Sequence, residues 1–215
     1  TFEDRVDIST TQTHQITGHS SVIRMKGSLV LDDRSELQIS NGATLLIEGS
    51  ATLRDGARIR CSGSECMMIN EGVVRSPGEA ATIDIPFRQD GELHVGGDNI
   101  VFTAGVILNK PINTTGAVRL ESNWLHVNPA IDLSGTVIDW YVRAQETFLS
   151  GPNAPQVRQI YVGGSSSYGM TISDVQGLGA DAQPLCVDNV RVQSSADLTV
   201  RSPLVCDSLL LNNGD

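Results

Sequence analysis

Carboxylates are the most plentiful side chains of this chain that could do chemistry. Its 215 residues include 25 Asp and Glu against 15 Lys and Arg. Polysaccharide hydrolysis uses two carboxyl groups across a groove, one as acid and the other as base or nucleophile. The adjacent Asp32-Asp33 has this chemistry, but it lies where an eight-residue repeat of short strands needs a turn, and Asp favours turns. We therefore expect no catalytic residues, and we expect the chain not to be an enzyme.

The four histidines, His14, His19, His94 and His126, form none of the spacings used for metal binding or catalysis. His-x-His and His-Glu-x-x-His are absent, as are Gly-x-Ser-x-Gly and the glycine-rich nucleotide-binding patterns. The sequence therefore predicts no metal site and no cofactor.

Four cysteines suggest two disulfides, Cys61–Cys66 and Cys186–Cys206. The loop from Cys61 to Cys66 is short enough for a bridge to close it. A zinc site needs a second closely spaced pair, whereas nineteen residues separate the other two cysteines and no histidine lies near them. Free buried thiols are the alternative. Disulfides persist in oxidising compartments, so we expect a secreted or cell-surface protein.

Large rings are scarce, and Trp124, Trp140 and Tyr141 form their main concentration. If exposed, they could stack on sugar rings; if buried, they would fill an irregular part of the core, which is the interpretation we favour. Asn113-Thr114-Thr115 fits the pattern for N-glycosylation of Asn113.

Charge and hydropathy exclude several partners. The net charge is −10 and the pI is about 4.7. A nucleic-acid-binding protein needs a basic patch for phosphates, and an anionic membrane surface would repel this chain. No apolar run approaches the ~20 residues of a spanning helix, so we expect no membrane insertion.

An internal repeat of eight residues is the strongest structural signal. From Ser28 the blocks read SLVLDDRS, ELQISNGA, TLLIEGSA and TLRDGARI, and NVRVQSSA and DLTVRSPL follow the same template from Asn189. Each block is a short alternating strand followed by a polar or Gly-containing turn. Apolar residues recur at steps of eight, at Leu29, Leu37, Leu45 and Leu53, and two residues later at Leu31, Ile39 and Ile47.

Strands this short must stack to bury their apolar faces. The steady period predicts an all-β fold, a parallel β-solenoid (β-helix) in which three blocks make a 24-residue coil and Leu29 lies beneath Leu53. Asn41-Gly42 and Asp55-Gly56 are doublets typical of hairpins, so an antiparallel sandwich or meander is the alternative.

We expect an extended segment over residues 1–17 and one solenoid domain over residues 18–215, with a weak boundary near residue 150. The N-terminal segment would either cap the first coil or be donated to a neighbouring subunit, because solenoid ends expose unpaired strands. Residues 140–149 contain no Pro or Gly and hold large side chains at helical spacing, which suggests one short helix.

The repeats from Ser20 to Ile59 and from Asn189 to Leu204 resemble the short-strand coils of bacterial β-helical surface proteins, of the filamentous-haemagglutinin-like adhesin and autotransporter-passenger type. The resemblance implies a parallel β-helix displayed outside the cell for adhesion or as a rigid spacer. The cysteines depart from it, since many such passengers lack them.

We therefore expect a non-enzymatic extracellular structural or adhesion protein, with other surface proteins or glycans as partners. A carbohydrate-binding or carbohydrate-cleaving β-helix, like a phage tailspike, is the first alternative. A filament subunit that polymerises by donating its N-terminal strand is the second.

Overall fold

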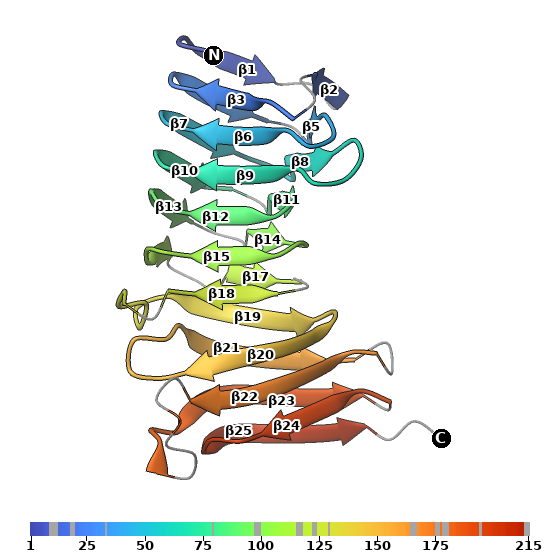
Figure 1. Cartoon of the computed structure of the whole chain (residues 1–215), viewed down its shortest axis with the longest axis vertical. Coiled ribbons are helices and arrows are strands. Elements are labelled where there is room, and N and C mark those ends of the chain that lie inside the picture. The colour runs from blue at the N-terminus through green and yellow to red at the C-terminus, as the bar shows by residue number, and fades with distance from the viewer. Residues whose placement is uncertain are drawn as a thin grey trace.

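The chain is a parallel β-solenoid, as the repeat predicts (Figure 1). The computed structural model describes residues 1–8, 13–17, 20–32, 34–78, 80–96, 100–114, 118–121, 124–128, 130–163, 167–174, 177, 181–193 and 195–212. These residues contain no α-helix, and every strand pairing among them is parallel, so the antiparallel alternative is wrong.

The first part of the solenoid is three-sided, because each coil contributes one strand to each of three sheets. We name these the side sheet (β1-β4-β7-β10-β13-β16), the front sheet (β18-β15-β12-β9-β6-β3) and the long sheet, whose first strands are β2-β5-β8-β11-β14-β17. The strands are β1 Val6–Ile8, β2 Thr13–Ile16, β3 Val22–Met25, β4 Ser28–Leu31, β5 Glu36–Ile39, β6 Thr44–Ile47, β7 Ser50–Leu53, β8 Arg58–Cys61, β9 Met67–Asn70, β10 Val73–Ser76, β11 Thr82–Asp84, β12 Phe87–Gln89, β13 Glu92–Val95, β14 Val101–Phe102, β15 Val106–Leu108, β16 Ile112–Thr114, β17 Val118–Leu120 and β18 Leu125–Val127.

The last part is two-sided and built from longer strands. The long sheet continues through β19, β21, β23 and β25, while β20-β22-β24 form a lower front sheet that follows the front sheet on the same side of the molecule (Figure 1). The strands are β19 Val137–Val142, β20 Gln145–Ser150, β21 Gln156–Val162, β22 Gly169–Asp174, β23 Leu185–Gln193, β24 Asp197–Val200 and β25 Leu204–Asn212. The long sheet runs through both parts, and the turn at residues 151–154 lies between β20 and β21 within one coil. The weak boundary near residue 150 stays a prediction.

The core is the stack of inward-pointing aliphatic side chains. The predicted core residues Leu29, Leu37, Leu45 and Leu53 are fully buried, which confirms the repeat. The predicted coil length is wrong, because Leu29 pairs with Ala51, 22 residues later, and Leu53 lies beside Leu31. The corner between β6 and β7 holds two residues, whereas the other two corners of that coil hold four, so the step of eight is not kept.

Glycines occupy one corner of successive coils, at Gly27, Gly49, Gly72 and Gly91. A Cβ on any of the last three would overlap backbone of the coil before it; on Gly72 it would overlap the Gly49 carbonyl. The tight two-residue corner therefore requires glycine, because only backbone without a side chain can approach this closely. Gly42 and Gly56, of the predicted hairpin doublets, instead turn corners between strands of different sheets, with φ of +72° and +78°.

The predicted short helix at residues 140–149 is wrong. This segment forms the ends of β19 and β20, with a turn between them. Trp140 and Phe148, spaced as on a helix, point into the core from opposite sheets and meet edge to face, with ring centroids 5.8 Å apart. The two rings therefore meet because two facing sheets pack together, and not because they share one face of a helix.

The two ends differ in how well they are covered. Residues 1–8 and 13–17 pair with the first full coil of their own chain, β1 with β4 and β2 with β5, in the place a cap would take. Donation of this segment to a second subunit stays a prediction. At the other end, Leu209 and Leu211 continue the inward column but are 54% and 63% exposed, since no described strand covers them.

Candidate functional site

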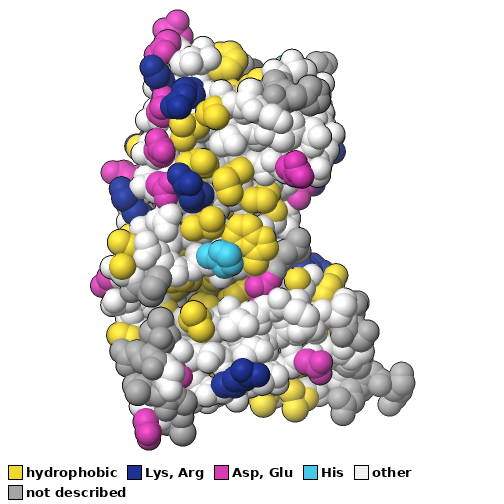
Figure 2. Space-filling model, in the orientation of Figure 1, with side chains coloured by type: hydrophobic (Ala, Val, Ile, Leu, Met, Phe, Trp, Pro, Cys, Tyr) yellow, Lys and Arg dark blue, Asp and Glu magenta, His cyan; other side chains and the backbone are white. Residues whose placement is uncertain are grey.

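The outer face of the front sheet carries a stripe of mixed apolar and basic side chains. Parallel strands in register place outward residues of successive coils in columns. One column contains Arg24, Leu46, Ile69, Arg88, Ile107 and His126. Hydrophobic side chains gather in the middle of this face, with a histidine beside them, at the level where the molecule narrows (Figure 2). In this column Ile69 and Ile107 are partly exposed, whereas Leu46 is only 6% exposed, so the part around Ile69 and Ile107 marks a candidate binding surface.

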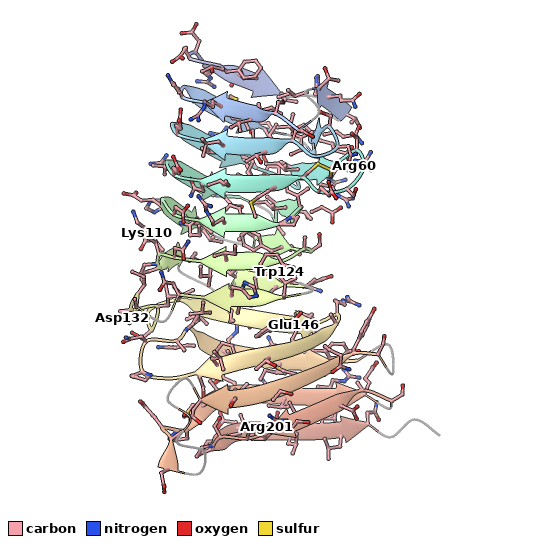
Figure 3. All side chains as sticks on the ribbon, viewed as in Figure 1. Arg60, Lys110, Trp124, Asp132, Glu146 and Arg201 are labelled. Atoms are coloured by element: carbon pink, nitrogen blue, oxygen red, sulfur yellow. A yellow bond between two sulfur atoms is a disulfide. The ribbon has the colours of Figure 1, made fainter. Side chains whose placement is uncertain are left out.

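Trp124 lies at the lower end of this stripe, immediately before β18 (Figure 3). Its ring covers Gly105 of the coil above: a Cβ on Gly105 would overlap the ring, nearest to Cε2. Cε2 is bonded to three other ring atoms in the ring plane, so the Cβ of residue 105 would meet it from above or below that plane. Gly105 therefore faces the flat side of the indole. The indole therefore lies against the sheet by one face and turns the other away, and Gly105 is the residue that permits this.

His126 adds a polar group beside the indole, whereas Glu146 lies on the inner side of β20, in the column of the buried Met170. The Trp124 and His126 ring centroids are 4.9 Å apart. Glu146, in β20, accepts a hydrogen bond from the Leu125 N–H, which β18 leaves unpaired because it is the last strand of the front sheet. Partial burial raises the pKa of Glu146 to about 7, against the hydrogen bond that lowers it. Near neutral pH this carboxyl can therefore both donate and accept hydrogen bonds.

The three aromatic residues predicted as a binding group do not form one cluster. Burial, the interpretation favoured from the sequence for all three, holds for Trp140, which is fully buried, but not for Trp124 and Tyr141, which are partly exposed. Tyr141 follows Trp140 in β19 and so points to the opposite side, outward from the long sheet. The sequence alone could not distinguish the inward Trp140 from the outward Tyr141, because it did not show that residues 137–142 form a strand.

Tyr141 belongs to a second cluster that sequence reasoning missed. Its ring centroid is 5.7 Å from that of Tyr161, and the Arg119 guanidinium lies 4.2 Å from it on the other side. Arg191 lies 5.6 Å over the Tyr161 ring. The sequence feature that could have revealed this cluster is the interval of 20 residues between the two tyrosines, which equals the local coil length.

The candidate carboxylate pair of the sequence gains no support as a site. Asp32 lies 3.4 Å from Arg54 of the next coil in an exposed ion pair, and Asp33 lies outside the described residues. Similar pairs link Arg60 with Glu36 at 2.6 Å and Arg24 with Glu48. Acidic residues at these positions bind arginines of neighbouring coils, and each such exposed pair stabilises the fold little.

One predicted disulfide is confirmed and the other is wrong. Cys61 and Cys66 are bonded, with Cα atoms 5.8 Å apart. Cys186 and Cys206 are free thiols. The register explains this, because Cys206 pairs with Val187 and Cys186 with Val205, so their side chains point to opposite faces.

Asn113, the predicted glycosylation site, is exposed on β16. Thr115 of the same motif lies outside the described residues, so glycosylation stays a prediction. In the described part of the chain, no group of three or more His, Cys, Asp or Glu side chains could hold a metal ion. The described residues also include no helix long and apolar enough to cross a membrane.

Comparison of the chain with protein-family models, curated proteins and solved structures finds no match. Inference about function therefore rests on the fold and on the two aromatic clusters, around Trp124 and around Tyr141.

Proposed function

We propose that this protein is a non-enzymatic extracellular adhesion protein whose rigid β-solenoid presents a glycan-binding surface centred on Trp124. The observation that carries the proposal is the indole held flat on Gly105 with its outer face turned away from the sheet. Sugar rings have apolar faces, and an indole fixed in this way offers stacking without loss of side-chain freedom on binding.

The neighbours of Trp124 suit a neutral sugar. The His126 imidazole, whose ring centroid is 4.9 Å from that of the indole, supplies a hydrogen-bonding group that can donate or accept, as hydroxyl groups require. The partly exposed Ile69 and Ile107 above, with Arg88 between them, would extend the contact along the front sheet. A flat surface of this kind suits an extended chain of sugars better than a single small molecule.

An extracellular location is supported by the Cys61–Cys66 disulfide, since such bonds persist in oxidising compartments. The regular coils also support a presenting role, because each coil contacts its neighbours along the axis and the stack is stiff. These are the properties expected from the resemblance to β-helical adhesins.

Binding to immobilised neutral polysaccharides (starch, chitin, xylan and mannan) tests the proposal. We expect retention on at least one of them, weakened at least about tenfold by Trp124→Ala, since loss of an aromatic platform costs about 1–3 kcal/mol. Phe2→Ala, which removes a partly exposed ring at the N-terminal end, is the matched control and should bind normally. Equal binding by both variants, or no retention on any polymer, would contradict the proposal.

Cleavage of the same glycan is a second candidate function, which the pKa of Glu146 favours. A carboxyl that is half-protonated near pH 7 and bound to the N–H of Leu125, the residue after Trp124, could act as a general acid. Release of reducing ends from a retained polysaccharide, abolished by Glu146→Gln, would establish cleavage. Binding without such release would leave adhesion as the function.

A further inference from the structure

A hollow of about 420 Å³ lies on the outer face of the long sheet, in the two-sided part of the solenoid. Strands β19, β21, β23 and β25 stack their outward residues into two columns there. The first column is Tyr141, Tyr161, Arg191 and Leu210, and the second is Asp139, Gln159, Asn189 and Ser208. The volume falls within the ~300–1,000 Å³ typical of small-ligand sites.

Arg191 supplies the positive charge of this hollow. Among the described residues no carboxylate lies within ion-pair distance of its guanidinium, which the Tyr161 ring supports at 5.6 Å. The other cations nearby are already paired, Arg119 with Glu121 at 2.6 Å and Arg158 with Asp139. One guanidinium is therefore left to bind a carboxylate.

The remaining polar groups of the hollow are neutral and of mixed character. Asn189 accepts a hydrogen bond from Ser208 through Oδ1, at 2.6 Å, which leaves its amide N–H groups to donate. Gln159 and the Tyr161 hydroxyl line the same hollow and can each donate and accept. A ligand that fits has one negative charge and several hydroxyl groups, rather than many charges.

We propose that this hollow binds an acidic sugar residue, its carboxylate on Arg191 and its hydroxyl groups on Gln159, Asn189 and Tyr161. The net charge of −10 does not prevent this, because charges beyond a Debye length of ~8 Å are screened at physiological ionic strength. The site is separate from Trp124, since it lies on the long sheet and not on the front sheet.

Calorimetric titration with a glucuronate-containing tetrasaccharide tests this site, with neutral chitotetraose as the comparison ligand. We expect the acidic sugar to bind more tightly, and Arg191→Gln to weaken it about tenfold or more, as for loss of a charged hydrogen bond. Tyr161→Phe should weaken it less. Arg201→Gln, at an exposed arginine of the lower front side (Figure 3), and Trp124→Ala should not change it.

Three outcomes would overturn the proposal. The first is no binding of the tetrasaccharide at millimolar concentration by a folded wild-type protein. The second is equal weakening by Arg191→Gln and Arg201→Gln, which would show a general charge effect. The third is equal binding of a glutamate-rich peptide, which would show an anion site without sugar selectivity. Both exposed arginines can be replaced without opening the core, and circular dichroism checks that each variant is folded.

Discussion

The three-sided and two-sided parts of the solenoid use one continuous sheet but differ in almost everything else. Strands in the first part have two to four residues and surround a core of mostly Leu, Ile, Val and Ala, with two methionines and the paired rings of Phe87 and Phe102. Strands in the second part have up to nine residues, and Trp140 and Phe148 span the space between two facing sheets. Facing sheets lie about 10 Å apart, which small side chains do not fill.

The two parts also differ in what they present to solvent. Ion pairs between neighbouring coils occur in both parts, such as Arg60 with Glu36 in the first and Arg158 with Asp139 in the second. The aromatic clusters around Trp124 and Tyr141 lie at the change of cross-section or beyond it. Both aromatic clusters thus lie where the regular coils end or beyond them, although a hollow of about 570 Å³ beside Arg75, His94 and Asn113 lies on the regular part. Matched substitutions in the two parts test this division, from the largest expected effect to the smallest.

A charge placed in the core should separate the regular coils from the open end. Leu45 is fully buried, whereas Leu209 is 54% exposed at an equivalent inward position of the last described strand. Leu45→Asp should lower the free energy of unfolding by about 4 kcal/mol or more, because it buries an unpaired carboxylate. Leu209→Asp should cost below about 1 kcal/mol. Urea unfolding measures both, and equal losses would show that the end is as closely packed as the middle.

The corner glycines should matter only where coils are tightly stacked. A Cβ at Gly72 would overlap the Gly49 carbonyl, whereas a Cβ at Gly135, at the start of the two-sided part, meets nothing within 4 Å. Gly72→Ala should therefore destabilise the protein by about 2–3 kcal/mol through overpacking against rigid backbone. Gly135→Ala is the matched control and should be neutral or slightly stabilising. A neutral Gly72→Ala would mean that the corners can widen.

The disulfide should stabilise the first part, and the free thiols should contribute nothing comparable to the second. Closing a loop as short as Cys61–Cys66 is worth about 2 kcal/mol in the chain-entropy relation. Cys61→Ser with Cys66→Ala should show a loss of that size, whereas Cys186→Ser with Cys206→Ser should stay within about 0.5 kcal/mol. Peptide mapping under non-reducing conditions should find one linked pair, and a Cys186–Cys206 peptide would contradict the register of β23 and β25.

The sequence predicts the first part of this fold far better than the second. Leu29, Leu37 and Leu45 follow a period that only stacked strands explain, and all three are buried. The predicted coil length is wrong because a step of eight cannot show that Glu48 and Gly49 make a shorter corner. In the second part, aromatic spacing at Trp140 and Phe148 imitates a helix, since a turn between two strands gives the same interval.

Of the residues at the candidate site, only Trp124 is predicted from the sequence, and its neighbours are missed. Trp124 stands out because tryptophan is rare in this chain. The contributions of Gly105, His126 and Glu146 depend on which strands are neighbours, and that register is not visible in a single sequence. Arg191 and Tyr161 are likewise brought together by coils of unequal length.

The smallest expected effect concerns the pH dependence of stability, where Glu146 of the second part should differ from Glu92 of the first. Burial raises the pKa of Glu146 to about 7 in the folded protein, whereas a hydrogen bond from His94 lowers the pKa of the exposed Glu92. Between an unfolded pKa of ~4.3 and the folded value of Glu146, the folded protein binds more protons than the unfolded chain. The contribution of Glu146 to stability is therefore complete below pH ~4.3 and is lost as the pH rises through about 7.

Glu146→Gln should remove this loss, because the amide does not ionise and its oxygen can still accept the Leu125 N–H. Unfolding free energies measured from pH 5 to pH 8 should diverge, with the Gln variant more stable at pH 8 by about 1 kcal/mol once solvent screening is allowed for. Glu92→Gln should show no such gain, since its ionised form is the favoured one. Parallel curves for wild type and Glu146→Gln would mean that the carboxyl is ionised throughout this range. In that case Glu146 could not donate a proton to a bound sugar, which would contradict glycan cleavage as a function. The proposed binding of sugars to the Trp124 indole would be unaffected.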